Sequence, residues 1–206
     1  MQWLFDLVFP PRTDEQRLRA MSTDDFLALV SPRLVDCTRP GTVALLSFHH
    51  PVVRAAVHEA KYHGNASAFS LLGAVLAEYL QDHDQLSRRI TVVPIPLGTE
   101  REKERGGNQV HQIVLRALQS MSDRETFVLE NGLLVRTRET ASQVSLAREK
   151  REENMHNAFV ATGSADPART YIVVDDVITT GATLQAAVDA LRTAGAQNII
   201  PLAIAH

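Results

Sequence analysis

The chain has 206 residues, of which 45% are hydrophobic and 22% charged, and its formal net charge is -3. This composition favours one folded domain with a substantial core and excludes a disordered, fibrous or broadly basic chain that coats nucleic acid. The longest apolar runs are far below the roughly 20 residues that span a bilayer, so we expect no membrane insertion and a cytoplasmic location. The single cysteine, Cys37, has no partner in the chain, so neither an internal disulfide nor a cysteine-cluster zinc site is expected.

The predicted elements alternate between helices and strands after an irregular N-terminal region. Residues 13–16 have the spacing of a capping box, which predicts a short helix through about Met21, and a second short helix is expected after Thr23. Pro51 suits the first turn of a helix that ends at Gly64. Further helices are predicted at residues 71–80, 110–121 and 183–195, and strands at residues 90–96, 132–136, 171–175 and 198–205.

This alternation indicates the fold class. Strands that alternate with amphipathic helices predict an α/β domain around a mostly parallel sheet. The domain is predicted to cover residues 46–206, and residues 1–45 are predicted to form an N-terminal appendage without zinc ligands.

The stretch YIVVDDVITTGAT, residues 171–183, combines two polar features. Asp175 and Asp176 come directly after an apolar strand, at the sheet edge where open α/β sheets bind ligands. Small and hydroxyl residues then lead into a helix, so that its first backbone N–H groups can converge on a phosphate. The residues of this predicted phosphate cradle are Thr179, Thr180, Gly181, Ala182 and Thr183. Paired carboxylates beside such a cradle suit ribose hydroxyls, or a magnesium ion held partly through the ligand.

Each half of this stretch also has an ordinary structural explanation. Two aspartates after a strand are typical of a solvated turn, and Thr-Thr-Gly before a helix is typical of an N-cap. Apolar residues followed by Asp-Asp also resemble the magnesium-binding strand of nucleotide triphosphatases, but the chain lacks the Gly-x-x-x-x-Gly-Lys-Ser/Thr loop that this class requires. The succession of the two halves favours a ribose-phosphate site.

Four segments carry a resemblance to known proteins. VVDDVITTGAT resembles the phosphoribosyl pyrophosphate signature of type I phosphoribosyltransferases. VVRAAVHEAKYHG, VVPIPLGTEREKERGGNQ and LVRTRETASQVSLAREKREENMHNAF are similar to segments of the ComF family, the phosphoribosyltransferase-like proteins linked to DNA uptake in competent bacteria. The resemblance covers the chain from about Val52 onward. It implies a type I phosphoribosyltransferase fold, with a mostly parallel sheet flanked by helices and a small N-terminal helical hood.

The resemblance also implies roles for individual residues. Asp175 and Asp176 would hold the ribose 2′- and 3′-hydroxyls, with Mg²⁺ bound mainly through the ligand, and the cradle would bind the 5′-phosphate. The residues implied to face the pyrophosphate are Leu97 and Gly98 in a backbone loop and Arg136, Arg138 and Arg151 in a lid over residues 136–156. The implied reaction is displacement of pyrophosphate from the ribose anomeric carbon by a nitrogen acceptor, and either aspartate is a candidate to take the acceptor's proton. For Asn108 a helix cap is expected rather than a phosphate contact.

Two functions are compatible with these features. One is an enzyme that transfers phosphoribose from phosphoribosyl pyrophosphate. The other is a non-catalytic module that keeps the fold and senses nucleotides, or binds single-stranded DNA or the proteins of DNA uptake and replication restart. The acceptor and the oligomeric state are left open by the sequence.

The chain departs from the ComF pattern at several positions. The cysteine cluster of the family's zinc-binding module is absent from the sequence, so no zinc is expected. Gly107 stands where phenylalanine is usual. Glu100, Glu102 and Glu104 dilute the positive potential of the pyrophosphate loop. The histidines, His49 and His50 among them, are expected to be surface or packing residues rather than metal ligands.

Overall fold

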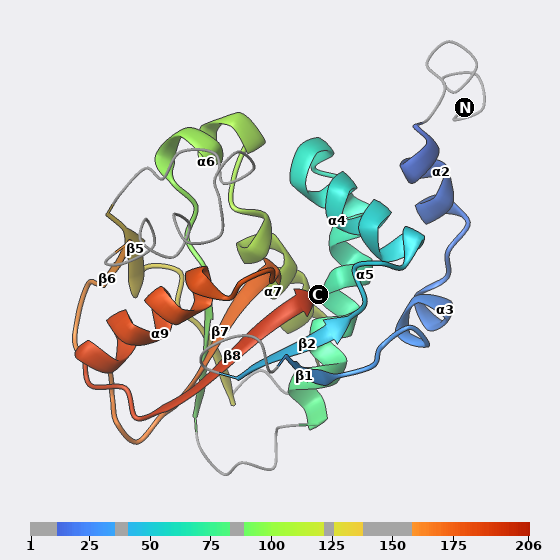
Figure 1. The fold of residues 1–206 in the computed structure, drawn as a ribbon. Helices are drawn as coiled ribbons and strands as arrows, with labels where there is room; N and C mark the ends of the chain where they lie inside the picture. The colour runs from blue at the N-terminus through green and yellow to red at the C-terminus, as the bar shows by residue number, and fades with distance from the viewer. Residues whose placement is uncertain (1–11, 36–40, 83–88, 122–125, 138–157) are drawn as a thin grey trace.

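A mixed sheet forms the centre of the molecule (Figure 1). The computed structural model describes residues 12–35, 41–82, 89–121, 126–137 and 158–206. The sheet has six strands in the order β1-β2-β8-β7-β3-β4. These are β1 (Arg33–Val35), β2 (Thr42–Leu46), β3 (Ile90–Pro94), β4 (Phe127–Leu129), β7 (Thr170–Val177) and β8 (Asn198–Ala205). Every neighbouring pair is parallel except β1 and β2, which confirms the predicted mostly parallel sheet.

Strand β7 lies in the interior of the sheet. It pairs with β3 on one side and β8 on the other. Ile172, Val173 and Val174 are fully buried, as expected for β-branched residues in a strand that is covered on both faces. Pairing with β3 extends to Val174 and pairing with β8 extends to Val177, so β8 holds the carboxyl end of β7 in place.

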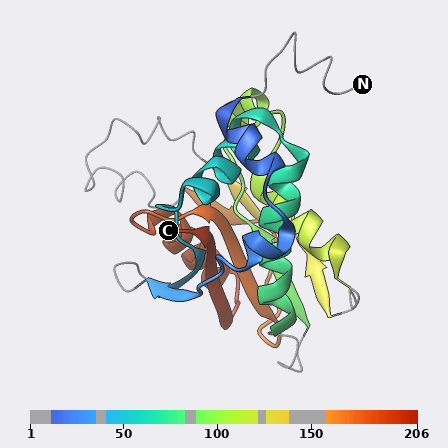
Figure 2. The same ribbon diagram turned by 90° about the vertical axis from the view of Figure 1, so that its right-hand side faces the viewer.

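Helices cover both faces of the sheet (Figures 1 and 2). One core cluster joins the sheet to α4 (Pro51–His63), α5 (Ala66–Asp82) and α7 (Gln109–Ser120). A second cluster joins the opposite face to α9 (Ala182–Thr193). The short helices α2 (Thr13–Arg19) and α3 (Thr23–Leu27) pack against α4 and α5. No helix among the described residues combines the length and the apolar character needed to cross a membrane.

A small second sheet lies beside α9. It consists of β5 (Leu134–Arg136) and β6 (Phe159–Ala161), which pair in antiparallel fashion. The predicted strand at residues 132–136 is thus confirmed, but it lies outside the main sheet. In sequence, β5 and β6 flank residues 138–157, which include most of the predicted lid at residues 136–156 and lie outside the described residues.

Several predicted boundaries differ from the observed ones. Helix α2 begins at Thr13 and ends at Arg19, so its N-cap is Arg12 and the predicted capping box is wrong. Four strands, β1, β2, β4 and β6, were not predicted. Three of them, β1, β4 and β6, have only three residues each, which are too few to show an alternating pattern. Helix α6 (Thr99–Arg105) was not predicted because it buries no residue and therefore has no apolar periodicity. The division between residues 45 and 46 stays a prediction, and it falls inside β2, which pairs with β8.

A close approach between α5 and α7 fixes the position of α7. A Cβ atom on Gly73 would lie 2.8 Å from Cβ of Arg116 and 3.2 Å from the backbone nitrogen of Ala117. These two helices can therefore pack at this distance only because Gly73 has no side chain. The first residue of α7, Gln109, matters for the site described below.

We expect Gly73→Val to lower the free energy of unfolding by about 2 kcal/mol, because the added methyl groups force α5 and α7 apart. Gly163→Val is the matched control, since a Cβ at Gly163 meets open space, and we expect it to change stability by less than about 0.5 kcal/mol. Urea unfolding measures both. Equal effects of the two substitutions would contradict this account of the packing.

Candidate functional site

The two aspartates belong to β7 and do not follow it. The predicted strand at residues 171–175 continues to Val177, because Asp175 pairs with Ala203 and Val177 pairs with Ala205 of β8. Asp176 is only 8% exposed, and Asp175 is half-buried. A solvated turn is thereby excluded, and the carboxylates lie near the carboxyl end of the strand, as predicted.

The two carboxylates have different surroundings. Successive side chains of a strand point to opposite faces of a sheet. Ile172 and Val174 belong to the core cluster under α4, α5 and α7, whereas Val173 belongs to the cluster under α9. Asp176 continues the first series and Asp175 the second, so the two side chains point to opposite faces of the sheet.

Asp176 is bound by groups from two helices on its face of the sheet. Nζ of Lys61, in α4, lies 3.0 Å from Oδ1. Nε2 of Gln109, in α7, donates to Oδ2 at 3.0 Å. The backbone N–H of Val177 donates to Oδ1 at 2.6 Å. The Asp176 carboxylate is therefore paired and fixed in orientation.

These two contacts were not predicted. Lys61 and Gln109 both lie in segments that resemble the ComF family, but the sequence assigned neither of them a role in the site. The sequence offered one indication of these contacts, which is that both residues lie near a helix end. Lys61 comes just before the Gly64 that ends α4, and Gln109 comes just after the Asn108 that caps α7. Only the packing of both helices on β7 brings them to the same carboxylate.

Asp175 is held less strongly. Burial, followed by the negative charge of Asp176, raises the pKa of Asp175 to about 7. The positive charges of Lys61 and Arg136 and a hydrogen bond from the backbone N–H of Asp176 act in the opposite direction. A carboxyl group that titrates near neutral pH can accept a proton from a bound nucleophile.

The predicted phosphate cradle lies directly after β7 and begins α9. Gly181 is the N-cap of α9 and has a φ of 80°, a left-handed conformation that glycine adopts without strain. Oγ1 of Thr180 accepts from the backbone N–H of Ala182 at 3.4 Å. The residues of the cradle, Thr179 to Thr183, thus lie at the edge of the sheet that carries the aspartates. An N-terminus of a helix at such an edge favours an anion.

The predicted pyrophosphate loop lies beside this edge. Leu97 and Gly98 connect β3 to α6, and Gly98 is the N-cap of α6. The backbone N–H of Ile95 donates to the carbonyl oxygen of Val174 at 2.9 Å, which ties the start of the loop to β7. Asn108 accepts from two backbone N–H groups at the start of α7 and donates to the carbonyl oxygen of Ile95 at 2.8 Å. The predicted capping role of Asn108 is therefore confirmed.

The structure places one of the three predicted lid arginines. Arg136 ends β5, and its guanidinium lies 5.4 Å from the ring centroid of Phe159. Its positive charge acts to lower the pKa of Asp175, and this is the smallest of the effects on that carboxyl group. Arg138 and Arg151 lie outside the described residues.

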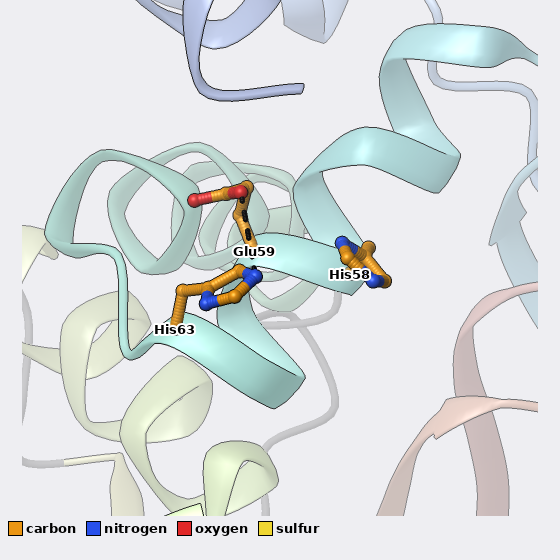
Figure 3. Close-up of side chains that lie close together, drawn as sticks. All are labelled: His58, Glu59 and His63. Atoms are coloured by element: carbon orange, nitrogen blue, oxygen red, sulfur yellow. Dashed lines mark ion pairs between the residues drawn. The ribbon is translucent and has the colours of Figure 1, made fainter. Parts of the chain in front are cut away.

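A second group of polar side chains lies near the end of α4. His58, Glu59 and His63 bring their potential ligand atoms within 4.8 Å of one another (Figure 3), although the sequence indicated no metal-ligand spacing among the histidines. The Glu59 side chain is fully buried, and Arg12 donates to its two oxygens at 2.9 and 2.7 Å while Asn65 donates to one of them at 3.1 Å. The Arg12 hydrogen bond holds the pKa of Glu59 below its usual range. We interpret this group as a structural contact between α2 and α4 rather than a metal site, because the Glu59 carboxylate is already bound by Arg12 and Asn65.

Comparison with known proteins places the chain in the phosphoribosyl transferase domain family. Residues 83–205 match the model of the phosphoribosyl transferase domain. The chain is 33% identical over 117 residues to "Competence protein F" of Haemophilus influenzae, a match that covers 56% of this chain and 49% of that protein. It is 30% identical over 129 residues to "Competence protein ComFC" of Streptococcus pneumoniae, with 63% and 54% covered. It is 30% identical over 155 residues to "DNA utilization protein YhgH" of Escherichia coli, with 72% and 65% covered.

The family match covers more than half of the chain and includes β3, β7, α9 and both aspartates. The chain therefore belongs to the phosphoribosyl transferase domain family, and its relatives confirm the predicted likeness to ComF phosphoribosyltransferase-like proteins. The matches span about half to two thirds of the length of these curated relatives.

The raised pKa of Asp175 predicts a pH-dependent cost to stability. The folded protein holds the Asp175 proton more tightly than the unfolded chain, so its stabilising contribution is complete below about pH 4 and is lost as the pH rises through about 7. Between pH 4 and pH 8 we expect wild type to lose on the order of 2 kcal/mol relative to Asp175→Asn, after allowance for partial exposure. Urea unfolding at a series of pH values measures this difference.

Asp82→Asn, at the exposed end of α5, is the control and should follow the wild-type pH profile. A difference between wild type and Asp175→Asn that is constant from pH 4 to pH 8 would contradict the assignment of a raised pKa to Asp175.

Proposed function

We propose that this protein binds phosphoribosyl pyrophosphate together with Mg²⁺ and transfers the phosphoribosyl group to a nitrogen acceptor. The observation that carries the proposal is the succession, at one sheet edge, of the two β7 aspartates and the Gly181 start of α9. Carboxylates accept hydrogen bonds from ribose hydroxyls, and a helix start binds the 5′-phosphate. Membership of the phosphoribosyl transferase domain family supports the same ligand.

In this proposal, different residues bind different parts of phosphoribosyl pyrophosphate. Asp175 and Asp176 accept hydrogen bonds from the ribose hydroxyls, and residues 179–183 bind the 5′-phosphate. The loop at Leu97 and Gly98 offers backbone amides to the pyrophosphate, and Arg136 adds positive charge, joined in our proposal by Arg138 and Arg151. The oxygen donors of the aspartates fit Mg²⁺, but Asp176 is already paired with Lys61. The ion is therefore held mainly by the ligand's own oxygens.

The proposed reaction breaks the bond between the anomeric carbon and the pyrophosphate oxygen and forms a bond from that carbon to the acceptor nitrogen. The pyrophosphate leaves with the electron pair, and bound Mg²⁺ supplies neutralising charge for it. The acceptor's proton goes to the Asp175 carboxylate, because Asp176 is occupied by Lys61 and Gln109 while the pKa of Asp175 lies near 7. The chain binds and orients both reactants and excludes water from the anomeric carbon.

A second candidate function is a binding module for unpaired nucleic acid bases or for a partner protein in DNA uptake. One surface favours it. Tyr62 is 61% exposed, the guanidinium of Arg105 lies 5.5 Å from its ring centroid, and the ring of His58 lies 5.0 Å away. Exposed aromatic and basic side chains of this kind stack on unpaired bases. The names of the relatives, which refer to competence and DNA utilization, are compatible with this role. In both candidate functions we place the protein in the cytoplasm.

Ligand binding is tested by a thermal shift. We expect phosphoribosyl pyrophosphate with Mg²⁺ to raise the melting temperature of wild type by several degrees at a large excess over its Kd, because a ligand that binds only the folded state stabilises it. Asp175→Asn/Asp176→Asn should lose most of this shift while remaining folded. The same ligand without Mg²⁺ is the control for the ion. An unchanged melting temperature in wild type would disprove the binding proposal.

Turnover is tested by pyrophosphate release. Wild type is incubated with phosphoribosyl pyrophosphate, Mg²⁺ and a panel of nucleobases and ammonia, and we expect acceptor-dependent release with at least one of them. Asp175→Asn should lower that rate by about 100-fold or more, as expected for loss of a proton acceptor. Binding without release would reject transfer to these acceptors. In that case, salt-dependent binding of single-stranded DNA that is lost in Tyr62→Ala would support the second candidate function.

A further inference from the structure

Asp176 is held by two residues that come from different helices and contact different oxygens. Lys61 reaches Oδ1 from α4, and Gln109 reaches Oδ2 from α7. The side chains of Lys61 and Asp176 are 20% and 11% exposed, so this ion pair is largely removed from water. The carboxylate therefore has little freedom to rotate.

The surroundings of this contact are apolar. A narrow gap beside Asp176 is lined by the three polar side chains and by Val57, Ala60, Leu72, Ile113 and Ile204. In such surroundings a carboxylate needs bonded partners, since an unpaired buried charge is costly. Lys61 and Gln109 supply two of those partners.

Gln109 carries a second observation. Its side chain is nearly buried, and within the described residues its Oε1 has no hydrogen-bond partner. A buried unsatisfied amide oxygen costs stability. Of the two orientations of the amide, the one that presents N–H to Asp176 is kept despite this cost, because the other would bring two oxygens together. An apolar residue of similar size would pack here at lower cost, so the packing of the core alone does not account for Gln109.

We propose that Lys61 and Gln109 are positioning residues for Asp176. By holding both carboxylate oxygens from the helix side, they aim the free edge of the carboxylate at one of the ribose hydroxyls. This inference rests on the proposed function, because it requires a ribose at the carboxyl end of β7. Beyond the proposed function, it states that the preference for a sugar that carries this hydroxyl depends on two residues that do not touch the sugar.

The inference is tested by the affinity ratio between ribose 5-phosphate and its 2-deoxy and 3-deoxy analogues, measured by calorimetric titration with Mg²⁺. Loss of a hydrogen bond to a charged group weakens binding by about 10- to 100-fold. We therefore expect wild type to bind the analogue that lacks the hydroxyl facing Asp176 more weakly than ribose 5-phosphate by that factor. In Lys61→Met this ratio should fall toward one, mainly because ribose 5-phosphate binds more weakly. Lys61→Arg keeps a cation at this place and should restore part of the ratio.

Two further variants keep the test decisive. Gln109→Leu removes the other contact at similar volume and should lower the ratio in the same direction, which provides a result even if Lys61→Met does not fold. Lys103→Met makes the same substitution on the exposed surface of α6 and should leave the ratio unchanged.

The outcomes separate the inference from the proposed function. If Lys61→Met and Gln109→Leu weaken all three sugars equally and leave the ratio at its wild-type value, the two residues only stabilise the fold and the inference is wrong. If wild type binds none of the three sugars and also fails to bind phosphoribosyl pyrophosphate, the proposed function fails and the inference fails with it. A ratio that falls in both variants and recovers in Lys61→Arg supports the inference.

Discussion

The structure depends on how two adjacent carboxylates are accommodated at the end of a buried strand. Removing a charged group from water is costly unless it is paired, and the two carboxylates differ in how well they are paired. Asp176 has Lys61, Gln109 and a backbone N–H within bonding distance. Asp175 accepts a hydrogen bond from the backbone N–H of Asp176, and the positive charges of Lys61 and Arg136 act to lower its pKa. The result is one fixed carboxylate beside one whose pKa lies near 7. That difference is what gives the pair separate chemical roles in our proposal.

The fold supplies this arrangement through the position of β7. Because β7 lies between β3 and β8, helices on both faces can reach its carboxyl end. Helices α4 and α7 bring Lys61 and Gln109 to one face, and the close contact at Gly73 sets where α7 lies. On the other face α9 begins directly after the strand, with Gly181 at its start. The loop after β3 is tied to β7 through Ile95. Groups that are far apart in the sequence thus meet at one edge.

Much of the fold could be predicted because its main elements are long and regularly patterned. The strand at residues 198–205 was confirmed with these bounds, and the helix that begins at Pro51 was confirmed with Gly64 as its C-cap. The predicted cradle residues lie at the start of a helix, as expected from a consecutive pattern, and their binding of a phosphate stays a prediction. The extension of β7 through Asp176 to Val177 was missed because aspartate is depleted in strands, and pairing with β8 overrides that preference. The contact of Lys61 with Asp176 could not be predicted, because it depends on how α4 packs on the sheet rather than on any local pattern.

The central claim is that the carboxyl end of β7 binds a ribose with its 5′-phosphate. The most direct measurement is a crystal structure of the protein with phosphoribosyl pyrophosphate and Mg²⁺. We predict ribose hydroxyl oxygens within about 3 Å of the Asp175 and Asp176 carboxylates, and the 5′-phosphate against residues 179–183. A complex in which the ligand lies elsewhere, or in which its ribose makes no contact with either aspartate, would contradict the account.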